Sequence, residues 1–240
     1  MNIKKNKIVS YSYIATEYYD EVSHPTCANF RIASKLIISG FLQSLDIKNL
    51  IHILELGAGK SVVAEILEES GINFDSVIIS DNDGIMLNYS KNNFDNDKYT
   101  YRLLDAENID LPSTSCDLIV SSLGDPYNSD KFWDEVYRVL KPGGICLYTT
   151  PSYDWSSDFR INDSASHFAE FQTKTHELVY VPSYIYETQM QVEILKNHNF
   201  SVLDLQEISL KQLKSNSISS KLITGKGDEL SIVTGYALKK

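Results

Sequence analysis

The segment that decides the fold runs from Ile53 to Ser61 and reads ILELGAGKS. Its apolar first half predicts a short strand, and its two glycines, Gly57 and Gly59, predict a tight turn that leads into a helix. Glycines leave the main chain uncovered, so that a ligand can approach the backbone closely. The segment therefore predicts a strand–turn–helix unit with a ligand-binding turn.

Strand-like and helix-like segments alternate around this turn. The expected strands cover residues 51–55, 76–80, 99–103, 117–121, 145–149, 200–205 and 230–238, and the expected helices cover residues 30–42, 62–69, 85–91, 131–140 and 188–197, with the helix at 131–140 ended by Pro142-Gly143-Gly144. Strands that alternate with helices of this length form parallel sheets covered on both faces.

Two familiar glycine-rich loops fit the turn poorly. A phosphate loop requires a glycine five residues before Gly59, and Leu54 stands there inside the expected strand. A dinucleotide-binding fingerprint requires a third glycine, and Val62 occupies that position. The first interpretation is excluded, and the second rests on a partial motif.

The turn resembles the first motif, E/DxGxGxG, of the class I S-adenosylmethionine-dependent methyltransferases. Glu55, Gly57 and Gly59 match it, and the small residue Ser61 replaces the last glycine. S-adenosylmethionine is a cation without a pyrophosphate, so an acidic residue near its binding turn makes physical sense.

Four further segments match this family in order. Residues 81–87, DNDGIML, resemble D-x-S-x-x-M-L, and residues 104–112, LDAENIDLP, resemble G-D-A-E…L-P. Residues 117–120, DLIV, resemble F-D-L-V with Cys116 in place of the aromatic residue, and residues 133–144, WDEVYRVLKPGG, resemble E-x-x-R-V-L-K-P-G-G. The resemblance covers about residues 50–150 and extends more loosely to the C-terminus.

The resemblance implies an α/β fold: a Rossmann-like doubly wound sheet, mostly parallel with an antiparallel last strand, with helices on both faces and an N-terminal helical extension. We expect a single methyltransferase domain over residues 1–240. Its parts are a helical cap at 1–49, a cofactor-binding core at 50–150, an aromatic-rich insertion or lid at 151–187, and a C-terminal helix and strands at 188–240.

The resemblance also implies S-adenosylmethionine as cofactor and S-adenosylhomocysteine as product. Asp81 is expected to bind the ribose hydroxyls and Asp105 the adenine amino group. The expected cofactor-binding residues are Glu55, Gly57, Ala58, Gly59, Asp81, Asn82, Met86, Asp105, Ala106, Ser121, Ser122, Tyr19 and Arg31. Two alternatives stay open, because Asp81 could instead cap a helix and Arg31 could instead form a surface salt bridge.

Methyl transfer requires an acceptor pocket and, where the nucleophile loses a proton, a base. We expect a small-molecule acceptor, methylated on oxygen or nitrogen, in a pocket with aromatic walls. His24 is the candidate base, because a histidine titrates near neutral pH, although it could also be an exposed residue beside Pro25. Tyr127 and His167 are the candidate substrate-binding residues.

The charge balance bears on the acceptor. The 240 residues include 22 basic and 32 acidic side chains, a net charge of −10. Seventeen of the acids and five of the bases lie in residues 55–135, so the expected substrate segments are nearly neutral. This balance argues against nucleic acid, because phosphate neutralisation needs Lys and Arg. Two alternatives remain: a catalytically silent S-adenosylmethionine-binding partner subunit, and a nucleic-acid amino-methyltransferase, since residues 125–127, DPY, resemble D/N/S-P-P-Y/F.

The remaining signals concern location and partners. No apolar run approaches the ~18–20 residues that cross a bilayer, and no apolar signal segment follows the basic N-terminus. Cys27, Cys116 and Cys146 form no close pair, so neither a metal site nor a disulfide framework is expected. We expect a cytoplasmic protein without membrane contact, and the sequence is compatible with a homodimer.

Overall fold

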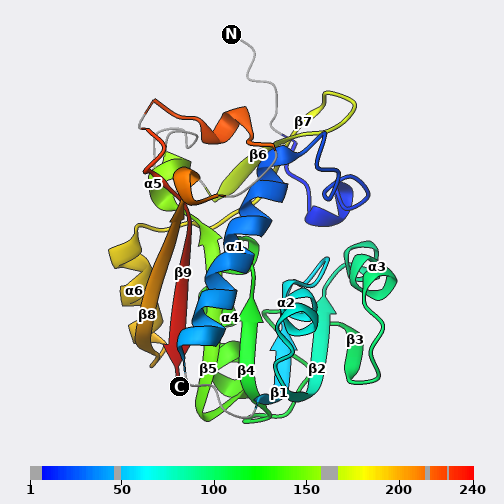
Figure 1. The fold of residues 1–240 in the computed structure, drawn as a ribbon, viewed down its shortest axis with the longest axis vertical. Coiled ribbons are helices and arrows are strands. Elements are labelled where there is room, and N and C mark those ends of the chain that lie inside the picture. The colour runs from blue at the N-terminus through cyan, green and yellow to red at the C-terminus, as the bar shows by residue number, and fades with distance from the viewer. Residues whose placement is uncertain (1–6, 46–49, 158–166, 214–216, 226) are drawn as a thin grey trace.

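The fold is built on a seven-stranded sheet. The computed structural model describes every residue except 1–6, 46–49, 158–166, 214–216 and 226. The strand order is β3-β2-β1-β4-β5-β9-β8 (Figure 1). The strands are β1 (Leu50–Glu55), β2 (Phe74–Asp81), β3 (Tyr99–Leu103), β4 (Cys116–Ser121), β5 (Leu140–Pro151), β8 (Ser201–Ser209) and β9 (Ser231–Lys239). Strand β9 runs antiparallel to both of its neighbours, and the other pairings are parallel. The predicted mostly parallel sheet with an antiparallel last strand is confirmed.

Helices cover both faces of this sheet. The α-helices are α1 (Pro25–Ser44), α2 (Val62–Ser70), α3 (Gly84–Asn93), α4 (Asp130–Val139), α5 (Tyr153–Ser156) and α6 (Thr188–Asn197), and the short 3₁₀ helices are η1 (Tyr11–Tyr13), η2 (Asp125–Tyr127), η4 (Leu210–Gln212) and η5 (Ser220–Leu222). Helices α1, α2 and α3 contribute to one buried core and helices α4 and α6 to the other. Successive side chains of a strand point to opposite faces of the sheet, so those of β1 enter the two cores in turn. Ile53 belongs to the first core and Leu54 to the second.

Side-chain caps explain where the core helices begin. The Ser61 hydroxyl accepts a hydrogen bond from the Ala64 N–H at 2.8 Å and begins α2. The Asp83 carboxylate accepts one from the Met86 N–H at 2.8 Å and begins α3. Asp83, and not Asp81, is therefore the residue that caps this helix.

Two boundaries differ from the sequence-based expectation. Helix α4 ends at Val139, and Pro142-Gly143-Gly144 lies within strand β5 and not in a separate turn. Gly143 adopts φ 79°, and its N–H donates to the carbonyl of Lys240 at 3.0 Å, so the C-terminus holds the start of this strand.

The N-terminal extension forms one α-helix, α1, which begins with Pro25 at its first turn, preceded by the 3₁₀ turn η1.

A second layer lies over the carboxyl ends of the sheet strands (Figure 1). It consists of residues 7–24 and the antiparallel hairpin of β6 (Phe168–Gln172) and β7 (Leu178–Pro182), and we call it the hairpin layer. Ile8 pairs with Tyr180, and a third buried cluster joins Ile14 to Phe171. The two aromatic-rich regions of the sequence thus pack on each other. Of the expected insertion at 151–187, residues 158–166 lie outside the described residues.

Helix α1 offers a matched test of this packing. Ile37 is fully buried and its methyl group occupies the space where a Cβ on Gly235 of β9 would lie, whereas the neighbouring Leu36 is 43% exposed. We expect Ile37→Ala to lower the free energy of unfolding by about 2–5 kcal/mol, because a buried cavity remains. Leu36→Ala should change it by less than about 0.5 kcal/mol. Urea denaturation of both variants measures the difference, and equal losses would contradict the described position of α1.

Candidate functional site

The candidate site lies where the order of the sheet strands reverses. Strand β1 has β2 on one side and β4 on the other, and in such sheets ligands bind at this point, beyond the carboxyl ends of the strands. A cavity of about 700 Å³ occupies this place, between the strand ends and the hairpin layer. The predicted cofactor residues that line it are Gly57, Ala58, Asp81, Asn82, Met86, Asp105, Ala106, Ser122, Tyr19 and Arg31.

Three predicted cofactor residues do not line the cavity. Glu55 is fully buried below the turn, where it accepts hydrogen bonds from the N–H groups of Val62 at 2.9 Å and Val63 at 3.2 Å and from the Ser61 hydroxyl. The N–H of Gly59 donates to Asp81, and the Ser121 hydroxyl pairs with the Tyr127 hydroxyl at 3.0 Å. The polar groups of Glu55, Gly59 and Ser121 are therefore paired with other protein groups below the turn. These residues support the turn and do not face the cavity.

The glycine turn needs its glycines for two reasons. Gly57 and Gly59 have φ of 61° and 48°, a left-handed conformation that residues with a Cβ rarely adopt. A Cβ on Gly57 would also lie 2.1 Å from the Tyr127 hydroxyl oxygen, and one on Gly59 would lie 1.9 Å from that of Tyr19. The two tyrosines therefore lie directly on the turn, and a bulkier residue at either glycine would displace them.

Asp81 ends strand β2 at the wall of the cavity. It is 6% exposed, and its two carboxylate oxygens accept hydrogen bonds from the N–H groups of Gly59 at 2.9 Å and Asp83 at 3.0 Å. Burial raises its pKa, although these bonds favour the charged form. Because each carboxylate oxygen can accept a second bond, Asp81 keeps capacity for a ligand hydroxyl. Asp105, after β3, is exposed and accepts the N–H of Glu107 at 2.9 Å.

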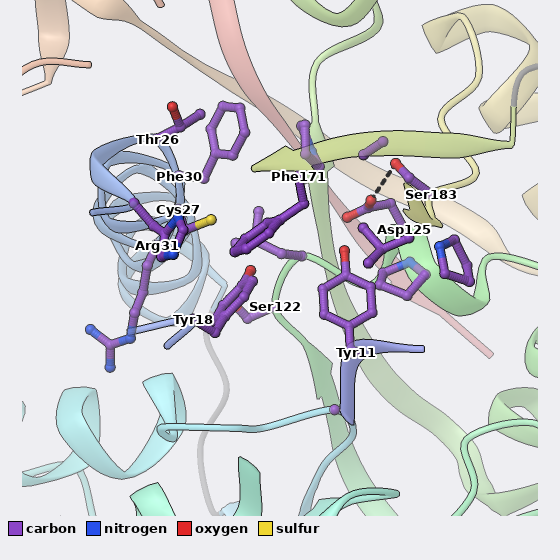
Figure 2. A pocket seen from close by; sticks show the side chains of 18 of the residues that line it. Tyr11, Tyr18, Thr26, Cys27, Phe30, Arg31, Ser122, Asp125, Phe171 and Ser183 are labelled. Carbon is purple, nitrogen blue, oxygen red and sulfur yellow. Dashed lines mark hydrogen bonds between the residues drawn. The ribbon is translucent and has the colours of Figure 1, made fainter. Parts of the chain in front are cut away.

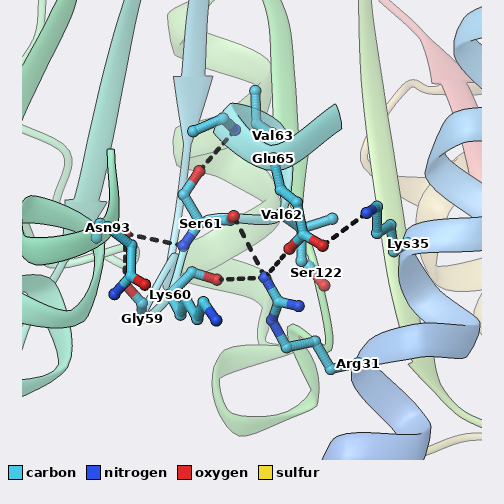
Figure 3. A network of polar contacts seen from close by, with 12 residues as sticks. Arg31, Lys35, Gly59, Lys60, Ser61, Val62, Val63, Glu65, Asn93 and Ser122 are labelled. Carbon is cyan, nitrogen blue, oxygen red and sulfur yellow. Dashed lines mark hydrogen bonds and ion pairs between the residues drawn. The ribbon is translucent and has the colours of Figure 1, made fainter. Parts of the chain in front are cut away.

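Arg31 reaches from α1 to the start of α2 (Figure 3). Its Nη2 pairs with Glu65 and donates to the carbonyls of Lys60 at 3.3 Å and Ser61 at 3.4 Å. Arg31 lines the cavity, and its buried Nε has no hydrogen-bond partner among the residues that the structure describes. Burial opposes ionisation of Glu65, but hydrogen bonds from Lys35 and Arg31 outweigh it and lower the pKa of this carboxyl. Arg31 thus forms the salt bridge that the sequence left open as the alternative to cofactor binding. Its buried Nε–H is still available as a hydrogen-bond donor.

His24 lies in the cavity wall and is not an exposed residue. It is 8% exposed, and its ring packs on Phe171 with centroids 4.4 Å apart. Its Nε2 lies 3.6 Å from the carboxylate of Glu17. At this distance the two groups form no hydrogen bond, and the buried Nε2 has no hydrogen-bond partner among the described residues.

The two predicted substrate residues are placed differently. Tyr127 lines the cavity and donates its hydroxyl to the Leu56 carbonyl at 2.9 Å. His167 does not line it, because its ring lies against Tyr184 with centroids 4.9 Å apart. The expectation that His167 contacts a substrate therefore has no support in this geometry.

The sequence did not identify several residues that line the part of the cavity next to the hairpin layer, which we call its upper end. Tyr11, Cys27, Asp125 and Phe171 line it, and they come from three segments that are far apart in the chain (Figure 2). The available signal was the concentration of aromatic residues in the extension and in the insertion. Burial raises the pKa of the Cys27 thiol to about 12, so this cysteine is not a nucleophile at neutral pH.

Two features are absent from the described residues. In this part of the chain, no group of three or more His, Cys, Asp or Glu side chains is placed to hold a metal ion. The helices described there are also too short or too polar to cross a membrane.

Comparison with known proteins gives one domain match and several similar folds. Residues 54–148 match the model of a methyltransferase domain. A Listeria monocytogenes structure assigned to the S-adenosylmethionine-dependent methyltransferases superposes with a TM-score of 0.68 at 16% identity, covering 88% of this chain and 98% of that one. A Haloferax volcanii complex of the Trm112 methyltransferase activator with a methyltransferase gives a TM-score of 0.64 at 12% identity, covering 95% and 96%. At these identities the structural likeness concerns the fold.

One curated relative is similar in sequence. A malonyl-[acyl-carrier protein] O-methyltransferase from Marinomonas sp. (strain MWYL1) is 30% identical over 149 residues. The match covers 60% of this chain and 54% of the relative. The chain thus matches about half the length of that protein.

Glu55 makes the stability of the turn dependent on pH. Burial raises the pKa of this carboxyl from 4.5 to about 7, so the unfolded chain releases the proton at lower pH than the folded one. Its contribution is therefore fully present below about pH 4.5 and is lost as the pH rises through about 7. The difference corresponds to about 3 kcal/mol.

Glutamine cannot ionise. We therefore expect the stability of Glu55→Gln to rise relative to that of the natural protein as the pH increases from about 4.5 to about 7. Urea midpoints measured across the range test this expectation, with the exposed Glu68→Gln as the control. Parallel pH profiles for all three proteins would contradict it.

Proposed function

We propose that this chain, whose residues 54–148 match the model of a methyltransferase domain, uses S-adenosylmethionine to transfer a methyl group to an oxygen or nitrogen of a small aromatic or apolar molecule. The observation that carries this proposal is one continuous cavity with two different ends. The glycine turn and Asp81 form one end, and the aromatic side chains of the hairpin layer form the other.

The lower end of the cavity fits the cofactor. Gly57 lines the cavity beside the Tyr127 hydroxyl, the Asp81 carboxylate can accept ribose hydroxyls, and the buried Nε of Arg31 can donate to the methionyl carboxylate. Asp105, which also lines the cavity, would accept the adenine amino group. When bound, S-adenosylmethionine supplies the methyl carbon: the acceptor's lone pair forms the new bond while the carbon–sulfur electron pair stays on sulfur, giving S-adenosylhomocysteine.

The upper end fits an acceptor. Its walls carry aromatic rings from Tyr11, Tyr18 and Phe171, which suit a planar or apolar body. His24 stands in this wall with Glu17 beside it, and it would take the proton that the acceptor loses. The curated relative, a malonyl-[acyl-carrier protein] O-methyltransferase, supports methyl transfer as the reaction class.

The cofactor assignment predicts the effect of one carboxylate. We expect Asp81→Ala to weaken S-adenosylhomocysteine binding at least about tenfold, because charged hydrogen bonds to the ribose are lost. Isothermal titration calorimetry measures the affinity. Asp110→Ala is the control, since its side chain is 91% exposed and does not line the cavity. Unchanged affinity in a folded Asp81→Ala protein would refute the assignment.

The acceptor assignment predicts the role of His24. We expect the natural protein to transfer a labelled methyl group from S-adenosylmethionine to a component of a small-molecule cell extract. His24→Gln should lower this rate about a hundredfold or more with S-adenosylhomocysteine affinity unchanged, because the proton acceptor is lost. His198→Gln, whose ring is paired with Asp130 and Asp134, is the control.

Other results of the same assay separate the alternatives. Cofactor binding without transfer to any extract would favour a catalytically silent partner subunit. Label incorporated into total RNA or DNA would favour a nucleic-acid amino-methyltransferase. Either result would replace the small-molecule proposal.

A further inference from the structure

The side chain of Tyr127 covers the first glycine of the turn. Tyr127 belongs to the 3₁₀ turn η2 after strand β4, and its ring lies against Phe132 with centroids 5.1 Å apart. A Cβ on Gly57 would lie 2.1 Å from the Tyr127 hydroxyl oxygen and 2.9 Å from two of its ring carbons. Both Tyr127 and Gly57 line the cavity. The phenol therefore occupies the space directly beside Gly57, at the end of the cavity that the glycine turn forms.

The hydroxyl of Tyr127 has two partners, at the ends of strands β1 and β4. It donates its one proton to the carbonyl of Leu56 at 2.9 Å, and it lies 3.0 Å from the hydroxyl of Ser121, which can donate to it. Neither partner lines the cavity, although the next residues, Gly57 and Ser122, do. Tyr127 thus separates these two polar groups from the cavity.

Other carbonyls of the turn are held by different side chains. Ser90, which is fully buried, donates to the carbonyl of Gly59 at 2.6 Å. Arg31 donates to the two carbonyls that follow and is itself tied to helix α2 by an ion pair. The carbonyl of Leu56 is bonded instead to a phenol of the cavity wall. A ligand in the cavity can reach this carbonyl by displacing one side chain.

An ammonium group is a stronger partner for the Leu56 carbonyl than this phenol. Burial raises the pKa of the Tyr127 hydroxyl well above its usual range, so the phenol stays neutral. A hydrogen bond from a charged donor is roughly twice as strong as one between neutral groups. An ammonium group also carries three protons, so it can donate to the Leu56 carbonyl and the Ser121 hydroxyl together.

We infer that the Tyr127 hydroxyl occupies the place of the cofactor's ammonium group in the ligand-free protein and leaves the Leu56 carbonyl when S-adenosylmethionine binds. This inference rests on the proposed function, which puts the ribose on Asp81 and the methionyl carboxylate on Arg31, and so places the amino-acid end of the cofactor at the glycine turn. The ammonium group takes over the carbonyl, and the ring turns about its side-chain bonds into the cavity that it lines.

The exchange couples the two ends of the cavity. Tyr127 is a predicted substrate-binding residue and lies in the same cavity wall as the glycine turn. When its hydroxyl leaves Leu56, the wall that the acceptor meets changes shape. A ligand without an ammonium group has no strong donor for this carbonyl, and it leaves Tyr127 in place.

Two ligands that differ in the amino-acid end test this exchange. S-adenosylhomocysteine carries the ammonium group, and 5′-methylthioadenosine has the same nucleoside and sulfur without the amino-acid end. We expect Tyr127→Phe, which keeps the ring, to bind S-adenosylhomocysteine at least about threefold more tightly than the natural protein, because no hydroxyl competes for the Leu56 carbonyl. The affinity for 5′-methylthioadenosine should change less than about twofold, because this ligand displaces no hydroxyl. Isothermal titration calorimetry measures all four affinities.

Two further variants locate the effect. Tyr19→Phe removes the other tyrosine hydroxyl on this turn, which accepts the N–H of Lys60. It should not raise the affinity for S-adenosylhomocysteine, because the lost group supports the turn. Tyr127→Met also lacks a hydroxyl donor and adapts to irregular space. It should show the same difference between the two ligands, and it covers the case in which Tyr127→Phe does not fold.

The outcomes separate this inference from the proposed function. Unchanged or weaker binding of S-adenosylhomocysteine to a folded Tyr127→Phe protein, an equal gain for 5′-methylthioadenosine, or an equal gain in Tyr19→Phe would overturn the inference. Failure of S-adenosylhomocysteine to bind the natural protein would instead overturn the proposed function.

Discussion

The structure depends on how the backbone of the glycine turn is satisfied from below. Glu55 accepts the first N–H groups of α2, and Asp81 accepts the N–H of Gly59. Ser90 accepts the N–H of Ser61 at 2.8 Å and donates to the carbonyl of Gly59 at 2.6 Å. Because buried side chains hold these polar groups, the turn keeps its shape without a ligand, and its residues Gly57 and Ala58 line the cavity beside Tyr127 and Tyr19.

The same turn ties the two ends of the cavity together. The hydroxyl of Tyr19 accepts a hydrogen bond from the N–H of Lys60 at 2.8 Å, and the hydroxyl of Tyr127 donates one to the carbonyl of Leu56. Tyr19 also lies edge-on to Tyr18, which belongs to the aromatic wall above. A ligand that moved either tyrosine would therefore disturb both the glycine turn and the hairpin layer.

The regular part of the fold could be predicted closely from the sequence. Helix α6 has the predicted ends, and the core strands differ from expectation by one or two residues at most ends, because buried strands and amphipathic helices are marked by local hydrophobic patterns. The glycine turn and Asp81 were found for a similar reason, since a motif and its spacing are local. His167 and Asp125 show where prediction from sequence stops. Both lie near the hairpin layer, and only packing decides that the His167 ring lies against Tyr184 while Asp125 lines the cavity.

By itself the sequence determined the class of sheet and the turn at its centre, and residues 54–148 match the model of a methyltransferase domain. These follow from hydrophobic period, glycine conformation and residue spacing, which act over a few neighbouring residues. The tertiary structure alone decided that residues 7–24 and the β6–β7 hairpin form one layer, and that Asp125, His24 and the aromatic rings face one chamber. The physical reason is that these contacts join segments more than a hundred residues apart, through packing that no local pattern encodes.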